Sequence, residues 1–508
     1  MKTAKLLISS AAIYTMIASS CAVASPVTLT SKDGKTSLKG ELLDFDGQFY
    51  KLDSGLGVAS IPAADVNCDG DSCPDLMIPA SIGVFGNDRS ASRALPQLLK
   101  AYGKSFGGAT DDASLSAGAG SNFDPATREI ADLISGEAEV ILSSRQIFDD
   151  EAKQLLPGGL TDVQHKGLEY VLASEGMVVA VDPSLQIDSI SLEDLGRVYS
   201  GEIRNWYELG GPDMPITVFM REFGSASRHA FNDLVLKPQG MQMSDRVIGV
   251  DNDTGVAASI VAFPGAMGIT GLAAAGTTKT LAIRDTCGLQ SVATPFAVQT
   301  GQYPLTRHLY AYRSPSADPS FIDGMVRFLQ SDDGRSALDE VGLIGHGILE
   351  DDPKSQGVRM MNAMAAVSNE RSQQTVRSMV DSLADAVRLS PTFRPDATGG
   401  YNALEYSSLK NLSKAITEGR YDGYEVLFVG FTDGESGDFQ GNQLLARSQA
   451  KRVHQSLIKL DPGLRNNRTV TFRALGYGGI SPLACSDTET GRRVNRRVEV
   501  WTRKLAAN

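Results

Sequence analysis

The segment 192–236 constrains the fold more than any other part of this chain. It contains a helical apolar pattern, turns at Asn205 and Gly210, a β-branched run, and then Arg221, a small-residue loop and a second helical pattern. A loop of this kind exposes backbone N–H groups at the positive end of a helix dipole, and the arginine adds a bidentate cation. The pattern therefore predicts an anion-binding junction. The alternative is a strand–loop–helix in which Ser227 only caps the helix.

The order of short motifs within this segment points to a family. The patterns G-x-I-x-N-W, P-I-x-V and R-x-x-G-S-x-[ST]-R follow one another there. This order resembles the phosphate-binding proteins of bacterial ABC importers, which have the type II periplasmic binding-protein fold. Residues 82–102 resemble the family's first strand, anion loop and helix, and residues 303–312 resemble its late hinge strand. The resemblance covers roughly residues 80–350 and implies a two-lobed α/β domain that binds phosphate or a related oxyanion.

The resemblance also implies ligand residues. Arg221, Ser225 and Ser227 match the family's Arg, Ser and Thr, and Ala226 stands where a Gly offers its backbone N–H. Arg145 stands where some members have an aspartate, so a second guanidinium would favour a fully ionised oxyanion. A degenerate sensor or scaffold domain is the alternative. The implied oxyanion-binding residues are Arg89, Ser90, Ser121, Ser144, Arg145, Arg221, Ser225, Ala226 and Ser227.

The C-terminal third has a different signature. A strand pattern at 425–433, an amphipathic helix at 442–453 and an arginine-flanked strand at 491–501 follow in order. This order resembles the OmpA-like peptidoglycan-binding domain over about residues 390–504. The resemblance implies an α+β domain attached to the cell wall, with an OmpA-like fold kept for oligomerisation as the alternative.

Recognition of zwitterionic diaminopimelate needs an acid for its ammonium group and a base for its carboxylate. Asp433 matches the family's acid, whereas Gln449 stands at the position of its ligand arginine. Arginines of the closing strand, Arg496 among them, are candidate replacements for the missing cation. The predicted peptidoglycan-binding residues are Asp433, Asn442, Gln449 and Arg496.

The N-terminus and the overall charge indicate where in the cell the protein is located. Residues 1–24 have the pattern of a secretory signal peptide that ends in an A-x-A cleavage motif, and a lipidated Cys21 is the alternative. No later apolar run approaches the eighteen or so residues that a transmembrane helix needs. The formal net charge of −12 argues against a nucleic-acid partner. We expect a protein of the Gram-negative periplasm that is associated with the cell wall or outer membrane.

The cysteines suggest one local crosslink. Cys68 and Cys73 lie in a short polar loop, which favours a disulfide in an oxidising compartment. The aspartates of that loop alternate as in a calcium site, but the downstream glutamate is absent, so no metal site is predicted. Cys287 and Cys485 lie in different predicted domains and are either buried thiols or an interdomain pair.

These observations combine into one domain plan and one function. The chain is predicted to be a multidomain α/β protein without catalytic residues or a cofactor, since no zinc, nucleophile-elbow or P-loop motif is present. We expect an oxyanion-binding protein anchored to peptidoglycan, with an ABC permease as a further implied partner. A non-transport scaffold or sensor is the alternative. The predicted parts are a signal peptide at 1–24, a small antiparallel β unit at 25–79, the phosphate-binding-protein-like domain at 80–350, a helical linker at 351–390 and the OmpA-like domain at 391–508.

Overall fold

The chain divides into two compact units, Met1–Asp75 and Leu76–Asn508. The structure is a computed structural model, and the signal peptide, Cys21, Ser121 and Ser144 lie outside the residues that it describes. Within the described part, no helix combines the length and the apolar character needed to cross a bilayer. The described residues are 26–31, 34–45, 49–55, 57–62, 65–70, 72–73, 81–84, 89–106, 114–117, 126–143, 145–165, 167–365, 367, 369–394, 400–434 and 438–505.

The first unit is an antiparallel sheet with strand order β4-β3-β2-β1-β5. Val27, Leu29 and Leu52 alternate with less buried residues and form its buried face. The predicted Cys68–Cys73 disulfide is present, with a Cα–Cα distance of 5.8 Å. It closes the turn after β5. The strands are β1 Pro26–Ser31, β2 Ser37–Phe45, β3 Phe49–Asp53, β4 Val58–Pro62 and β5 Val66–Asp69.

The first lobe of the second unit is built on parallel strands in the order β7-β6-β8, and β16 (Thr306–Arg313) pairs antiparallel with β8. Buried apolar side chains of α1, α9 and α10 pack on this sheet. The elements of the first lobe are β6 Ser81–Val84, α1 Arg89–Phe106, β7 Ser114–Ala117, α2 Ala126–Ser135, β8 Val140–Ser143, α3 Asp149–Leu155, α4 Gly159–His165, α9 Ser320–Gln330 and α10 Asp332–Glu340.

The second lobe has its own parallel strands in the order β12-β11-β13. The predicted helix, turns and strand of 192–236 are present in it, and Trp206 is fully buried in its core. The elements are β10 Ser189–Ser191, α5 Leu192–Ser200, η2 Trp206–Leu209, β11 Thr217–Arg221, α6 Ala226–Phe231, η3 Asn232–Leu236, η4 Lys237–Gln239, β12 Ile248–Val250, α7 Asp253–Ala262, β13 Ala266–Gly271, η5 Leu272–Ala274, β14 Lys279–Arg284, β15 Gln290–Ser291 and α8 Pro295–Gln299.

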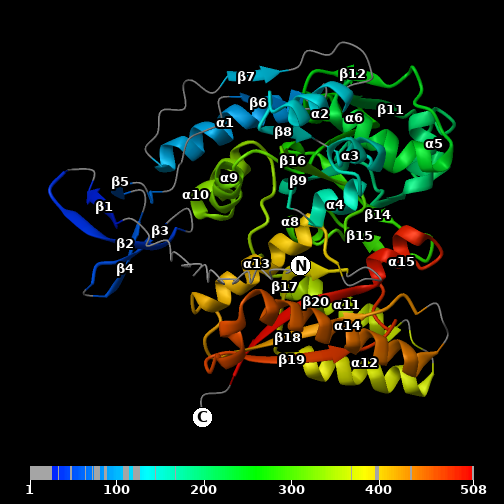
Figure 1. Cartoon of the computed structure of the whole chain (residues 1–508). Helices are drawn as coiled ribbons and strands as arrows, with labels where there is room; N and C mark the ends of the chain where they lie inside the picture. Colours follow the sequence, from blue (N-terminus) through cyan, green and yellow to red (C-terminus); the bar gives the residue numbers. More distant parts are fainter. Residues whose placement is uncertain are drawn as a thin grey trace, which may run out of the picture. The chain divides into compact units, whose positions relative to one another are not determined.

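Two long strands join the lobes, β9 Glu169–Val181 and β16 Thr306–Arg313 (Figure 1). The first half of β9 pairs with β16, and its second half, from Met177 onward, pairs with β13. One continuous strand therefore runs through both lobes. This is the place where a two-lobed α/β domain can bend.

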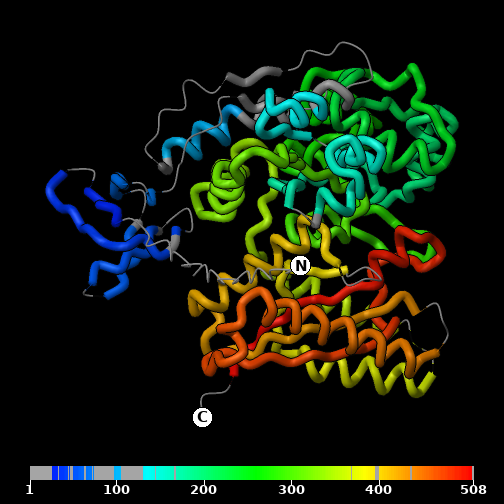
Figure 2. The backbone as a smooth tube through the Cα atoms, in the orientation of Figure 1, coloured from blue at the N-terminus to red at the C-terminus, as the bar shows by residue number. Residues whose placement is uncertain are grey.

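The C-terminal part is a mixed sheet in the order β17-β20-β18-β19. Figure 2 shows the chain entering it through yellow helices and ending in its red strand. The segment predicted as a linker is helical, and its apolar face packs onto the sheet, with Val376 and Leu383 against Leu427 and Trp501. The elements are α11 Pro353–Ala365, α12 Glu370–Leu383, β17 Val387–Phe393, α13 Ala403–Thr417, β18 Tyr424–Phe431, α14 Phe439–Leu460, η6 Pro462–Asn466, β19 Thr471–Gly476, α15 Glu489–Asn495 and β20 Arg497–Lys504.

Candidate functional site

The carboxyl ends of β11, β12 and β13 meet at one edge of the second lobe. The strands are parallel, with Arg221 at the end of β11 beside Val250 of β12. Gly271 ends β13, and Asp253 begins the helix that follows β12. In open α/β sheets, ligands bind outside the carboxyl ends of the strands. The predicted anion junction therefore lies where this fold class usually binds ligands.

The loop after β11 brings the predicted hydroxyl groups to this edge. Gly224 has φ of +81°, a left-handed conformation that glycine adopts without strain. Ser225 then caps α6, accepting a hydrogen bond from the backbone N–H of Arg228 at 3.3 Å. Ser225 and Ser227 are both 2% exposed. The Ser227 hydroxyl has no hydrogen-bond partner within the described structure, so it can serve a ligand.

Arg221 is buried beside a carboxylate that the sequence interpretation did not single out. Arg221 is 3% exposed, and its Nη1 donates to Oδ2 of Asp253 at 3.3 Å. The other oxygen of Asp253 accepts a hydrogen bond from the backbone N–H of Gly271 at 3.2 Å. Asp253 thus supplies the counter-charge that a buried guanidinium needs. Its place directly after a short strand, at the start of a helix, is the sequence signal that could have indicated it.

The first-lobe residues are placed differently. Arg89 and Ser90 begin α1, and only their backbone is described. Arg145 follows β8, and its guanidinium donates to both oxygens of Glu151, at 2.8 and 2.9 Å. It also covers the ring of Phe148, with 4.3 Å to the ring centroid. Arg145 is therefore held against the start of α3 by a bidentate ion pair.

The C-terminal domain brings its predicted acid and one of its arginines together. Asp433 follows β18, and Nη1 of Arg496 donates to its Oδ2 at 2.8 Å. The same guanidinium donates to Glu489 at 2.6 Å, and these two carboxylates raise the pKa of Arg496. Asp433 is only 14% exposed in its side chain. Its charge is balanced by the guanidinium of Arg496.

The two remaining predicted residues of this domain lie on α14. Asn442 is 8% exposed and packs against Gly478. Gln449 faces a cavity of about 840 Å³ that Arg496 also lines, and its Oε1 is buried without a hydrogen-bond partner. The structure thus places Gln449 and Arg496 around one space, and Asn442 inside a helix–loop contact.

Two histidines meet at the strands that join the lobes. The hydroxyl of Ser174 lies 2.6 Å from Nδ1 of His308 and 3.3 Å from Nε2 of His346. Burial lowers the pKa of His308 to about 4 and that of His346 to about 3. Both rings are therefore neutral near pH 7. They act as packed polar groups there and add no charge to the oxyanion edge.

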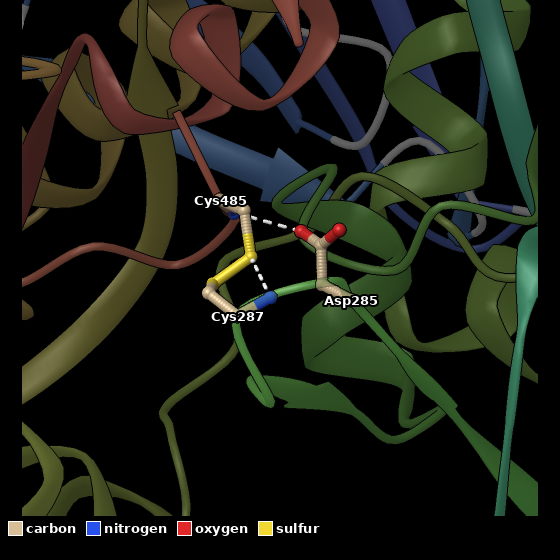
Figure 3. Close-up of side chains that lie close together, drawn as sticks. All are labelled: Asp285, Cys287 and Cys485. Atoms are coloured by element: carbon tan, nitrogen blue, oxygen red, sulfur yellow. Dashed lines mark hydrogen bonds between the residues drawn. A yellow bond between two sulfur atoms is a disulfide. The ribbon is translucent and has the colours of Figure 1, made fainter. Parts of the chain in front are cut away.

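The open question about Cys287 and Cys485 is settled by a disulfide between them (Figure 3). The backbone N–H of Cys485 donates to Asp285 at 2.7 Å, and that of Cys287 donates to the sulfur of Cys485 at 2.9 Å. These three residues form the one described group with the spacing of metal ligands. Because both sulfurs are joined to each other, no thiolate is left to coordinate an ion. The bond covalently joins the second lobe to the C-terminal domain.

Further contacts join the C-terminal domain to both lobes. Arg394 donates to the backbone oxygen of Thr300 at 2.8 Å, next to the second lobe. Asn411 donates to the backbone oxygen of His346 at 3.1 Å, on the side of the first lobe. The domain therefore bridges the region where the lobes meet.

Comparison with known proteins agrees with this architecture. Residues 90–332 match the family model of the PBP superfamily domain. The chain is 27% identical over 252 residues to the phosphate-binding protein PstS of Bacillus subtilis, covering 49% of this chain and 76% of that protein. It is also 39% identical over 94 residues to outer membrane porin F of Pseudomonas fluorescens, covering 18% of this chain and 26% of that protein.

One solved structure is also similar to this chain. The crystal structure of an ABC-type phosphate transport receptor from Vibrio cholerae has a TM-score of 0.41 and 19% identity to this chain, covering 52% of this chain and 98% of the receptor. The family model covers residues 90–332, and the relatives named phosphate-binding proteins match 41% and 49% of this chain. Residues 90–332 of this chain therefore form a PBP-like domain.

Proposed function

We propose that this protein binds phosphate or a related oxyanion at the edge formed by β11, β12 and β13. The observation that carries the proposal is the buried Arg221, held by Asp253 beside the buried hydroxyls of Ser225 and Ser227. A guanidinium in a dry site gives a strong charge-assisted contact to an oxyanion, and the hydroxyl and backbone N–H groups satisfy its remaining oxygens. The relatives named phosphate-binding proteins support phosphate as the first ligand to test.

The test is a panel of phosphate, sulfate, arsenate and a phosphonate, measured by calorimetry and thermal denaturation of the full chain. A ligand at one hundred times its dissociation constant should stabilise the folded protein by about 2.7 kcal/mol. We expect phosphate to give this stabilisation. If no oxyanion shifts the melting temperature, the domain is a scaffold or sensor without an oxyanion ligand, and the proposal fails.

We further propose that the C-terminal domain holds the protein to peptidoglycan in the periplasm. Asp433 supports this, because its carboxylate can exchange the guanidinium of Arg496 for the ammonium of diaminopimelate. The likeness to a porin from the outer membrane supports the location. A protein fixed to the wall cannot travel between solute and permease, so capture or sensing of the oxyanion fits better than shuttling it.

Retention on purified peptidoglycan tests the anchor. Asp433→Ala should abolish retention of the full chain, and Gln449→Arg should increase it by restoring a cation near the ligand carboxylate. Asp381→Ala, which removes an exposed carboxylate of α12, is the matched control and should be retained like the wild type. Wild-type protein that washes off at low salt would show that the domain is not an anchor.

A further inference from the structure

A buried ion pair lies at the point where β9 passes from the first lobe to the second. Glu175 of β9 and Arg307 of β16 are register partners, and Nε of Arg307 donates to Oε2 of Glu175 at 2.5 Å. Their side chains are only 12% and 9% exposed. Two residues after Glu175, at Met177, β9 begins to pair with β13 of the second lobe. The pair therefore lies where the two lobes are joined.

The carboxylate of Glu175 also contacts the end of β13, which is part of the oxyanion edge. Gly271 ends β13, and a Cβ atom added to this glycine would lie 2.5 Å from Oε1 of Glu175. The backbone N–H of Gly271 donates to Oδ1 of Asp253, whose other oxygen accepts from Arg221. Glu175 and Asp253 thus contact the same glycine, one where a side chain would project and the other at its N–H. A continuous series of contacts therefore connects the Glu175–Arg307 pair with the guanidinium of the proposed oxyanion site.

The four charged groups in this series cancel one another. Arg221 and Asp253 form one pair, and Arg307 and Glu175 form the other. His308, which follows Arg307 in β16, is neutral near pH 7 because burial lowers its pKa to about 4. Removing one partner of a buried ion pair leaves the other charge uncompensated, and a charge acts strongly where the local dielectric constant is low. The charge near the oxyanion edge therefore depends on both members of the Glu175–Arg307 pair.

We propose that the Glu175–Arg307 pair sets the electrostatic potential at the oxyanion edge, and with it the affinity for the anion; this inference rests on the proposed function. Arg307 neutralises a carboxylate that would otherwise repel the anion bound by Arg221. It is a positioning residue, since it acts through Glu175 rather than by contact with the ligand. An ion pair that only stabilised the fold would not make the affinity depend on the sign of the charge that is removed.

Calorimetry of phosphate binding to the full chain tests the proposal with two variants that change the charge in opposite directions. Arg307→Gln leaves the buried carboxylate uncompensated and should weaken phosphate binding by roughly tenfold. Glu175→Gln leaves the guanidinium uncompensated and should strengthen phosphate binding several-fold. The new amide oxygen can still accept a hydrogen bond from Arg307, so the local packing is kept. A purely structural role would never strengthen binding in one variant and weaken it in the other.

A double variant with Glu175→Gln and Arg307→Gln restores the balance of charge. Its phosphate affinity should return to within about threefold of the wild type, because the two effects oppose each other. This variant and Glu175→Gln keep the test decisive if Arg307→Gln does not fold. Arg197→Gln and Glu202→Gln are the matched controls, because they make the same charge changes at an exposed ion pair at the end of α5. Both should bind phosphate like the wild type, since solvent screens exposed charges.

The outcomes distinguish a failure of this inference from a failure of the proposed function. Phosphate binding that Arg221→Ala removes, but that Glu175→Gln does not strengthen, would overturn the role of the pair and leave the oxyanion site in place. Weaker binding in both single variants, without recovery in the double variant, would assign the pair to the fold alone and overturn the inference. Absence of phosphate binding in the wild type and in every variant would overturn both the site and the inference.

Discussion

The loops after β11 and after β8 contain the two arginines that the sequence assigns to one oxyanion, and their surroundings differ. Arg221 is buried and contacts the carboxylate of Asp253 through one nitrogen, at 3.3 Å. Arg145 is about one third exposed and donates to both oxygens of Glu151. A bidentate pair fixes a guanidinium in place, whereas burial strengthens the attraction between a guanidinium and an anion because the local dielectric constant is low. On this comparison we predict that Arg221, and not Arg145, contacts the oxyanion.

The strongest test of the comparison is Arg221→Ala. It should weaken phosphate binding by about 2 to 5 kcal/mol, because a charge-assisted contact in a desolvated site is lost. Calorimetry of the variant measures the change, and Arg246→Ala, at an exposed arginine of the same lobe, should bind like the wild type. Unchanged affinity in Arg221→Ala would mean that the ligand binds elsewhere.

The buried histidines His308 and His346 extend the comparison to basic groups that are neutral near pH 7 and are buried beside the hydroxyl of Ser174. The pKa of His308 is lowered to about 4 and that of His346 to about 3, so the unfolded chain binds more protons than the folded one below pH 6.5. The contribution of these histidines to the free energy of unfolding should therefore be fully present above pH 6.5. It should fall toward pH 3, by at most about 1.4 kcal/mol per histidine and pH unit. Urea denaturation at pH 7 and 5 measures this loss. A double variant with His308→Gln and His346→Gln should lose less stability between pH 7 and 5. An equal loss would exclude the histidines as its cause.

A smaller effect is expected for Ser227→Ala. The hydroxyl should contribute one neutral hydrogen bond to the bound oxyanion, worth about 0.5 to 1.5 kcal/mol. The phosphate dissociation constant should rise by a few-fold, and the melting temperature without ligand should stay the same because the hydroxyl has no partner in the described structure. Ser184→Ala, at an exposed turn, is the control. A drop in ligand-free stability would assign Ser227 to the fold instead.

The smallest effect is expected for Arg145→Ala. Its ion pair with Glu151 is partly exposed, so the variant should lose no more than about 1 kcal/mol of stability. Its phosphate affinity should stay within about twofold of the wild type, which calorimetry can resolve. A loss of affinity comparable to that of Arg221→Ala would show that Arg145 also contacts the ligand.

The sequence predicts the features that depend on neighbouring residues, and it misses contacts that depend on the tertiary structure. The turns and strand around Arg221 are local patterns, and the structure contains them where they are expected. The pairing of Arg221 with Asp253 joins residues 32 apart and depends on which strands are neighbours. The pairing of Arg145 with Glu151 is close in sequence, but Phe148 at the cap position lacks the side-chain oxygen by which such helix starts are recognised.

The C-terminal domain shows the same limit. Asp433 and Arg496 are predicted to belong to one site, and the structure shows them in contact, but their ion pair depends on the strand order of the sheet. The apolar periodicity of residues 351–390 predicts helices, but it does not show which surface these helices cover. Packing partners of this kind are decided by tertiary structure.

The Cys287–Cys485 bond has a consequence for the order in which the protein matures. The two cysteines are 198 residues apart, and the chain is made from its N-terminus, so Cys287 is complete long before its partner exists. Cys68 and Cys73 are only five residues apart and can close their turn early, which removes them as competing partners. The late bond can form only after Cys485 has been synthesised and brought within reach of Cys287. Once closed, it holds the C-terminal domain to the second lobe covalently.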